Sequence, residues 1–189
     1  MINHEHKFIF VRVAKTASTS IITKLPKSFN SCKGWKYDCN HIPIWHLKAN
    51  LDKDVFDTYF KFAFVRNPFE RAVSIVEYVN AFNRDNGFPH LICDFKEFYV
   101  KEFTNEQEKS KYSSQYDFIK GCDFVGKLEN LQEDFNIVCD KIGIRRQKLP
   151  HKNKTNHRHY TEYYDEETRE IVAKKYAKDI EYFEYKFGE

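Results

Sequence analysis

One stretch near the N-terminus, residues 7–25, constrains the fold of this chain more than any other. It reads KFIFVRVAKTASTSIITKL. The segment Phe8–Val13 has the β-branched and aromatic composition of a buried strand. A run of hydroxyl residues, Ser18–Ser20, then provides a helix start, and Pro26 ends that helix. The sequence therefore predicts a strand, a tight polar turn and a helix.

This predicted turn is suited to an anion. A strand–turn–helix unit points free backbone N–H groups and the positive end of the helix at a bound anion. Lys15 adds a mobile positive charge, and the hydroxyls add donors that rotate to fit phosphate oxygens. The turn contains no glycine and its lysine precedes the hydroxyls, so the usual Gly-x-x-x-x-Gly-Lys-Ser/Thr loop is absent. It is either a phosphate cradle of a less common kind or a turn whose hydroxyls only cap a helix.

A second stretch, residues 60–82, repeats the arrangement. Phe60–Val65 is another candidate for a buried strand. Asn67 can cap the following helix, and Pro68 fits the first helical position. Apolar residues then recur at helical spacing on one face. The chain thus contains two strand–turn–helix units.

The second unit also carries phosphate-binding groups. Arg66 lies where the strand ends, and Ser74 lies two turns into the helix. A guanidinium and a hydroxyl in these places can hold a second phosphate group. The alternative is that Arg66 pairs with a neighbouring acid and that Ser74 is an incidental helix serine. Taken together, the two units suit a nucleotide with two separated anionic groups.

These motifs resemble those of sulfotransferases that use 3′-phosphoadenosine 5′-phosphosulfate (PAPS). Lys15-Thr16-Ala17-Ser18-Thr19-Ser20 resembles their 5′-phosphosulfate loop. Phe64-Val65-Arg66-Asn67-Pro68, with Arg71 and Ser74, resembles their 3′-phosphate motif. The most similar branch is the Golgi-type carbohydrate sulfotransferases, or sulfotransferase family 2, which includes heparan sulfate 2-O-sulfotransferase. The similarity continues through residues 123–131, 149–154 and 179–183, and so covers nearly the whole chain.

The order of strands and helices predicts an α/β fold, with the ligand at the carboxyl ends of the strands. The resemblance implies a P-loop-like three-layer fold with a mainly parallel central sheet flanked by helices. A length of 189 residues suits one domain, residues 1–189. A helix is expected at residues 131–142, and one amphipathic helix at Asp165–Phe187.

The resemblance also implies the reaction. It implies that the sulfuryl group passes from PAPS to an acceptor hydroxyl, expected on a sugar, and that the product PAP remains. A histidine between the two motifs serves as general base, and His41 and His46 are the only histidines there. An imidazole suits this task because its pKa lies near neutrality. His41 is the preferred base, and His46 either contributes to the acceptor pocket or is the base. Lys15 would stabilise charge on the departing phosphate.

The nucleotide is expected to contact both motifs and a basic segment near residue 150. The implied binding residues are Lys15, Thr16, Ala17, Ser18, Thr19, Ser20, Arg66, Ser74, Lys154, Thr155, His157 and Arg158. The last four belong to Arg145–His159, which holds six Lys or Arg residues, three histidines and no acid. The resemblance implies a loop over the adenine and 3′-phosphate. By itself, such a run is also typical of solvated surface or a polyanion patch.

Composition and charge also bear on nucleic-acid binding, membrane insertion, secretion and zinc binding. The net charge of +3 is too small to indicate nucleic-acid binding. The apolar runs are too short to cross a membrane, because Arg12 and Arg66 interrupt them. The polar N-terminus leaves no room for a signal peptide. Five cysteines without a Cys-x-x-Cys pair predict no zinc site and reduced thiols in a cytoplasmic protein, with a Cys32–Cys39 bridge as the alternative.

Acceptor identity is the least constrained property. The polar stretch Thr104–Gln115 is either a determinant of acceptor specificity or a solvated connection. The expected partner is a saccharide or other hydroxyl acceptor, with no metal, no nucleic acid and no membrane span. Three other functions stay open. One is a non-catalytic PAP- or sulfated-glycan-binding module, and the second is a P-loop-type kinase, which would need magnesium and a glycine loop. The third is a nucleic-acid binder that would use Arg145–His159, although it explains neither phosphate motif.

Overall fold

The computed structural model describes four segments of the chain: residues 1–27, 41–104, 112–150 and 158–189. They form two compact units. Unit 1 comprises residues 1–66 and 115–154, and unit 2 comprises residues 67–114 and 155–189. Each unit has its own hydrophobic core. The expectation that residues 1–189 form a single domain stays a prediction.

Unit 1 contains a four-stranded sheet in the order β1-β2-β3-β4. Its strands are β1 (Ile2–Asn3), β2 (Phe8–Val11), β3 (Phe60–Val65) and β4 (Phe124–Lys127). The short β1 pairs antiparallel with β2, whereas β2, β3 and β4 are parallel. The predicted α/β fold with a mainly parallel sheet is confirmed. The first strand ends two residues earlier than expected, and β1 was missed because its surroundings are polar.

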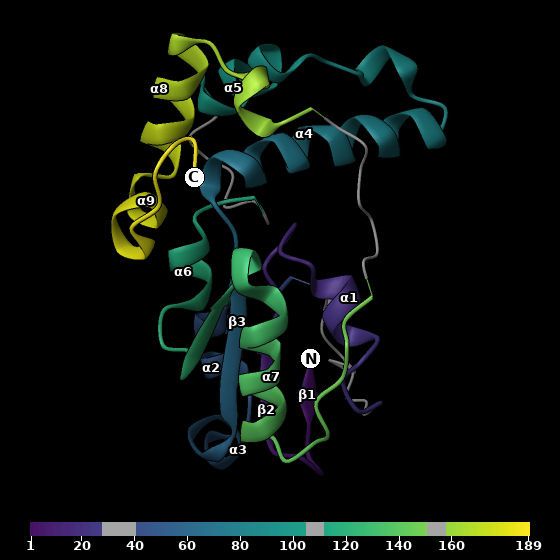
Figure 1. Cartoon of the computed structure of the whole chain (residues 1–189), viewed down its shortest axis with the longest axis vertical. Helices are drawn as coiled ribbons and strands as arrows, with labels where there is room; N and C mark the ends of the chain where they lie inside the picture. Colours follow the sequence, from purple (N-terminus) through teal and green to yellow (C-terminus); the bar gives the residue numbers. More distant parts are fainter. Residues whose placement is uncertain (28–40, 105–111, 151–157) are drawn as a thin grey trace. The chain divides into compact units, whose positions relative to one another are not determined.

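One face of this sheet is built from phenylalanines. Residues Phe8, Phe10, Phe62 and Phe64 alternate along β2 and β3 and pack with α1 (Ser18–Ile22) and α7 (Leu131–Lys141). Figure 1 shows α7 lying across the front of the strands. At the register pair Phe64 and Gly126, a Cβ on the glycine would lie 2.5 Å from the Phe64 ring. A glycine is therefore required at this point of β4.

The opposite face of the sheet is aliphatic and equally buried. Ile9, Val11, Ala63 and Val65 are at most 1% exposed. In Figure 1, α2 (Ile44–Asn50) lies behind the strands, on the side opposite α7. Helices thus cover both faces, which completes three layers. Two more helices belong to unit 1, namely α3 (Lys53–Thr58) and α6 (Gln115–Ile119).

Unit 2 is helical. Its elements are α4 (Pro68–Asp85), η1 (Pro89–Leu91), α5 (Phe95–Thr104), η3 (Tyr160–Tyr163), α8 (Glu166–Lys175) and α9 (Ala177–Phe183). The predicted start of α4 is confirmed, because the Asn67 side chain accepts a hydrogen bond from the Phe69 N–H at 3.0 Å. Its core is rich in tyrosine, and the Tyr99 hydroxyl donates to the Ala72 carbonyl at 3.3 Å. Buried phenols of this kind need such partners.

The single helix predicted for Asp165–Phe187 is wrong, since α8 and α9 are separated at Tyr176 (φ −111°, ψ 27°). The Tyr176 ring is fully buried, and its hydroxyl donates to the Tyr112 carbonyl at 2.9 Å. In α9, buried Asp179 accepts a hydrogen bond from the Ser114 hydroxyl at 2.7 Å. Tertiary hydrogen bonds at both residues outweigh the helical periodicity that the sequence shows.

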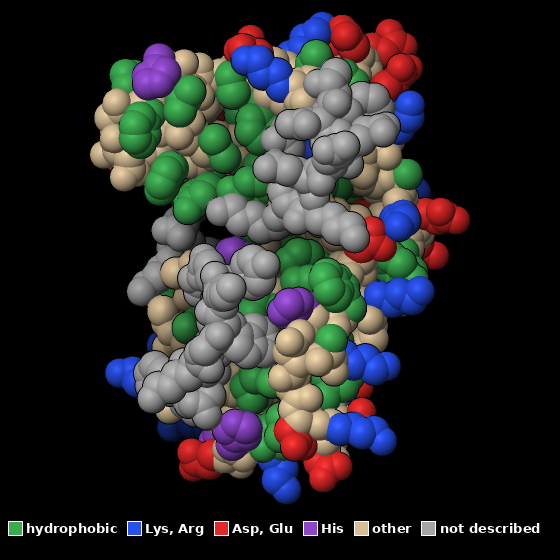
Figure 2. Space-filling view, turned by 180° about the vertical axis from the view of Figure 1, so that it is seen from behind, with side chains coloured by type: hydrophobic (Ala, Val, Ile, Leu, Met, Phe, Trp, Pro, Cys, Tyr) green, Lys and Arg blue, Asp and Glu red, His purple; other side chains and the backbone are tan. Residues whose placement is uncertain are grey.

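Unit 2 also exposes several large hydrophobic side chains near the end of α4. Those residues are Tyr78, Phe82, Phe88, Leu91 and Ile92. The end of α4 lies at the upper left of Figure 2, where hydrophobic side chains gather on the surface. The Tyr78 and Phe82 rings are one helical turn apart, with centroids 6.5 Å from each other. Among the described helices, none is both long and apolar enough to span a bilayer.

Candidate functional site

The turn between β2 and α1 has an unusual backbone. Lys15 (φ 68°) and Ala17 (φ 58°) both adopt left-handed conformations. Glycine normally occupies such positions, and an L side chain there costs about 1–2 kcal/mol. The Thr16 and Ser18 hydroxyls both donate to the Val13 carbonyl at 3.0 Å and hold the turn in this shape. Backbone strain that the surroundings maintain is a common property of functional sites.

The hydroxyl groups of this turn do not cap α1. The N-cap residue is Ala17, and no side chain makes a capping hydrogen bond there. The simpler reading of the sequence, in which the hydroxyls only cap, is therefore wrong. Thr16, Ser18 and Ser20 are buried, whereas Thr19 is exposed. Their proposed contacts with phosphate oxygens stay a prediction.

Two cations meet at the carboxyl ends of neighbouring parallel strands in unit 1. Arg66 follows β3 directly, and its Nη1 donates to the Lys15 carbonyl at 3.4 Å. Burial, and next the positive charge of Arg66, lower the pKa of Lys15 to about 8. Like charges brought together in a partly buried place are unfavourable by themselves. An anion bound between them would remove that cost.

The backbone of Arg66 is held by Gln115, the first residue of α6. The Arg66 N–H donates to Oε1 of Gln115 at 3.0 Å, and Nε2 of Gln115 donates to the Arg66 carbonyl at 2.9 Å. Gln115 is fully buried. This contact is not predicted from the sequence, in which Gln115 ends a polar connection, because no local pattern marks a partner 49 residues away. Residues 105–111 of that connection lie outside the described residues.

His41 is attached to the same strand end. Its Nδ1 lies 3.0 Å from the carbonyl oxygen of Arg12, the residue after β2. A carbonyl oxygen can only accept, so Nδ1 carries the proton and Nε2 of the neutral ring is the basic nitrogen. His46 lies in α2, where its ring packs edge to face against Trp45 with centroids 5.5 Å apart. The roles proposed for His41 and His46 stay predictions.

The remaining predicted site residues that the structure describes belong to unit 2. Ser74 is buried in α4. Arg158 is exposed, and its guanidinium lies over the Tyr163 ring at 4.9 Å from the centroid. Their proposed roles in nucleotide binding stay predictions. Three further members of the predicted set, Lys154, Thr155 and His157, lie outside the described residues, as do Cys32 and Cys39.

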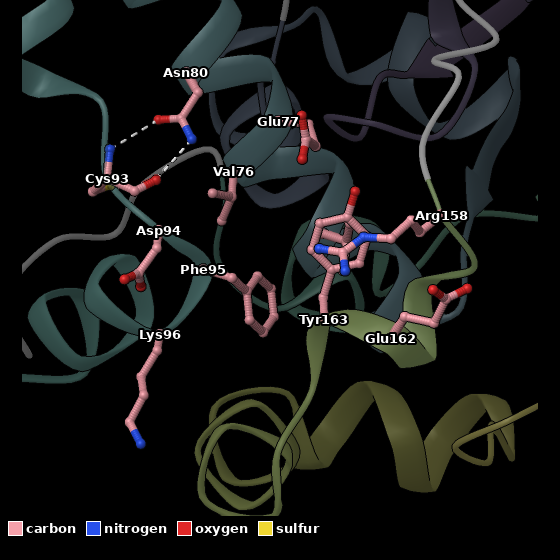
Figure 3. Close-up of a pocket in the computed structure, with 11 residues that line it drawn as sticks. Val76, Glu77, Asn80, Cys93, Asp94, Phe95, Lys96, Arg158, Glu162 and Tyr163 are labelled. Carbon is pink, nitrogen blue, oxygen red and sulfur yellow. Dashed lines mark hydrogen bonds between the residues drawn. The ribbon is translucent and has the colours of Figure 1, made fainter.

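Arg158 also lines a pocket of about 370 Å³ within unit 2. Figure 3 shows its guanidinium stacked on Tyr163, with the Glu77 carboxylate nearby on α4. Burial, followed by the charge of Glu77, raises the pKa of Tyr163. On another side of the pocket, Asn80 forms two hydrogen bonds with the backbone of Cys93. These contacts hold α4 to its neighbours. In the described part of the chain, no three His, Cys, Asp or Glu side chains gather to form a metal site.

Comparison with known proteins gives a consistent result. A family model described as "Sulfotransferase family" matches residues 1–186. Carbohydrate sulfotransferase 9 from Homo sapiens is 27% identical over 95% of this chain. That alignment covers 47% of the human protein, so the chain spans about half its length. An uncharacterised protein from Archaeoglobus fulgidus is 31% identical over 107 residues, which are 54% of this chain and 83% of that protein. No solved structure is significantly similar to this chain.

Proposed function

This chain belongs to the sulfotransferase family, and we propose that it transfers the sulfuryl group of PAPS to a hydroxyl group of a saccharide. Sulfuryl transfer itself follows from the family. The PAPS donor is supported by the two phosphate-binding motifs. The saccharide acceptor is supported by the human relative, which is named a carbohydrate sulfotransferase.

The observation that carries this proposal is the pairing of Lys15 with Arg66. Burial and the charge of Arg66 lower the pKa of Lys15 to about 8, so an anion bound beside it would favour the protonated lysine. PAPS is a bisphosphorylated nucleotide that supplies an activated sulfuryl group. Lys15 would contact its 5′-phosphosulfate end, and the Arg66 guanidinium would bind its 3′-phosphate with two parallel hydrogen bonds. The cationic donors fit the charge of such a ligand.

His41 would act on the acceptor. Its Nε2 accepts the hydroxyl proton as the acceptor oxygen bonds to sulfur and the bond from sulfur to the phosphate oxygen breaks. The Arg12 carbonyl accepts from Nδ1, which keeps the ring in place and stabilises the imidazolium that forms. Protonated Lys15 stabilises the negative charge that develops on the departing phosphate. The residues thus contribute positioning and electrostatics, without a covalent enzyme intermediate.

Nucleotide binding tests the first part of the proposal. PAP should raise the melting temperature of the wild-type chain, whereas ATP with Mg²⁺ should not. Lys15→Ala should reduce the shift, because it removes a cation from the phosphate site. Lys53→Ala is the matched control, since this exposed lysine begins α3, which precedes β3 in unit 1. Stabilisation by ATP–Mg²⁺ and not by PAP would support a kinase and contradict the proposal.

Turnover tests the second part. Incubation with PAPS and a panel of glycans and small alcohols should yield a sulfated product, detected by mass spectrometry. Lys15→Ala should lower the rate by about 10²-fold or more, as expected for loss of a preorganised charge. PAP binding without transfer to any member of the panel would favour a non-catalytic binding module instead.

A further inference from the structure

The contact between Gln115 and Arg66 lies where the sheet stops supplying backbone partners. Val65, the last residue of β3, pairs with Lys127 of β4, and the pairing of β2 with β3 ends at Ala63. Arg66 comes next in the chain. Both of its backbone groups bond to the carboxamide of Gln115. The buried Gln115 side chain therefore makes the two hydrogen bonds that a residue of a neighbouring strand would otherwise make with Arg66. The pattern is that of a hydrogen-bonded residue pair in an antiparallel sheet.

The two hydrogen bonds restrain the two peptide units around Arg66. The N–H group belongs to the peptide link with Val65, and the carbonyl belongs to the link with Asn67. Holding both limits rotation about φ and ψ of Arg66, and this sets the direction of its Cα–Cβ bond. The Arg66 side chain leaves the sheet in that direction and reaches the Lys15 carbonyl.

From these contacts, we infer that Gln115 is a positioning residue for nucleotide binding, which fixes the backbone of Arg66 so that the guanidinium lies beside Lys15. The inference rests on the proposed function, because it takes the pair of cations as the nucleotide site. Gln115 contacts the backbone N–H and carbonyl of Arg66. It acts through Arg66.

The chemistry of the side chain supports this role. An amide offers a donor and an acceptor side by side, as the N–H and C=O of one residue require. An ionised glutamate accepts from the N–H but has no proton for the carbonyl. A methionine has a similar shape and makes neither bond. Because Gln115 is fully buried, no water can take its place without a local rearrangement.

Unit 2 provides a matched control. The Asn80 carboxamide bonds to both backbone groups of Cys93, with its Nδ2 2.8 Å from the carbonyl and its Oδ1 3.2 Å from the N–H. This is the same two-bond contact, made to a residue with no part in the proposed reaction. Loss of the Asn80 contact should affect stability alone, whereas loss of the Gln115 contact should also affect ligand binding.

The experiment compares PAP affinity by isothermal titration calorimetry with the melting temperature. Gln115→Met should weaken PAP binding about tenfold or more, which corresponds to at least one well-placed phosphate contact. Gln115→Asn, whose amide is one methylene shorter and cannot reach both backbone groups in the same geometry, should also weaken it. Asn80→Leu should lower the melting temperature and leave PAP affinity unchanged. Wild-type affinity in a folded Gln115→Met variant would overturn the inference. If this variant does not fold, the neutral variant Gln115→Asn decides in the same way.

A double-mutant cycle separates positioning from a general structural effect. If Gln115 acts through Arg66, then Arg66→Met and the double variant Arg66→Met/Gln115→Met should bind PAP equally weakly. If the double variant bound PAP more weakly than Arg66→Met, by the factor that Gln115→Met alone produces, the inference would be overturned. Failure of the wild-type chain to bind PAP would contradict the proposed function itself, which distinguishes the two results.

Discussion

The strand ends of unit 1 and the start of α4 in unit 2 use the same residue types in opposite ways. At the strand ends, Arg66 has its backbone clamped and its guanidinium placed beside a lysine. In α4, Arg71 is 1% exposed, donates to the Ser113 carbonyl at 3.1 Å and lies over the Tyr176 ring at 5.6 Å. The backbone of Arg66 thus bonds to Gln115 and its guanidinium to the Lys15 carbonyl, whereas the guanidinium of Arg71 is buried in the core of unit 2.

Two arginines of one sequence motif therefore have different structural environments. Arg66 and Arg71 both belong to the segment that resembles the 3′-phosphate motif, yet the structure assigns them different surroundings. A buried guanidinium with a carbonyl and an aromatic face stabilises the fold. Two cations held together cost stability until an anion binds. Variants of the first region should therefore change function, and variants of the second should change stability.

The largest expected effect is on catalysis at the strand ends. His41→Ala should lower the transfer rate by about 10²–10⁴-fold, because it removes the proton acceptor. PAP affinity should be retained, since the imidazole lies on the acceptor side of the proposed reaction. His46→Ala is the comparison variant and should keep most of the activity. A larger loss in His46→Ala would transfer the role of base to His46.

The second effect distinguishes Arg71 from Arg66 by their contributions to stability and to PAP binding. Arg71→Met should lower the free energy of unfolding by about 3 kcal/mol, because a buried hydrogen bond and a ring contact are lost. Arg66→Met should change this quantity far less and should weaken PAP binding. Urea denaturation and calorimetry on both variants measure the two quantities. If the two substitutions lowered the free energy of unfolding equally, the proposed difference between Arg66 and Arg71 would be contradicted.

A third effect concerns proton uptake. Lys15 has a pKa of about 8 in the folded chain and 10.5 as its ordinary value. Between these values the unfolded state binds more protons, so this group makes the unliganded chain more stable as pH rises. A bound phosphate favours the charged lysine and raises its pKa again. PAP binding should therefore take up protons at pH 8–9 and weaken as pH rises through about 8.

Calorimetry in two buffers of different ionisation enthalpy measures this uptake. Lys15→Met is the control, because it cannot titrate and should show less uptake than the wild type. Identical uptake by the two proteins would contradict the assignment of the lowered pKa to the ligand site.

The smallest expected effect is relief of backbone strain. Ala17→Gly should raise the free energy of unfolding by up to about 1 kcal/mol, since glycine adopts φ 58° without a side-chain clash. Glu184→Gly in unit 2 is a matched variant, because Glu184 has the same φ of 58° at the end of α9. Thermal denaturation should show both gains. A loss of stability in Ala17→Gly would show that the methyl group makes a contact worth more than the strain.

Much of unit 1 follows from local sequence patterns. The apolar runs at residues 8–13, 60–65 and 123–125 predicted β2, β3 and β4, and each strand end lies within two residues of its predicted position. The sequence also placed Lys15 and Arg66 at the carboxyl ends of two strands in a mainly parallel sheet, and in the structure the Arg66 guanidinium donates to the Lys15 carbonyl. It failed at Gln115, at the break in residues 165–187 and at the capping hydroxyls. Each of these depends on a hydrogen bond whose partner no periodicity reveals.

The amino-acid sequence by itself determined the order of strands and helices, the parallel sheet and the two cations at its edge. It does so because strand and helix periodicities are local and parallel strands share one carboxyl edge. Only the tertiary structure decided that Gln115 holds Arg66, that Nδ1 of His41 donates to Arg12 and that Arg71 serves the core. Those outcomes depend on contacts between distant residues, where directional hydrogen bonds and burial select one partner among many.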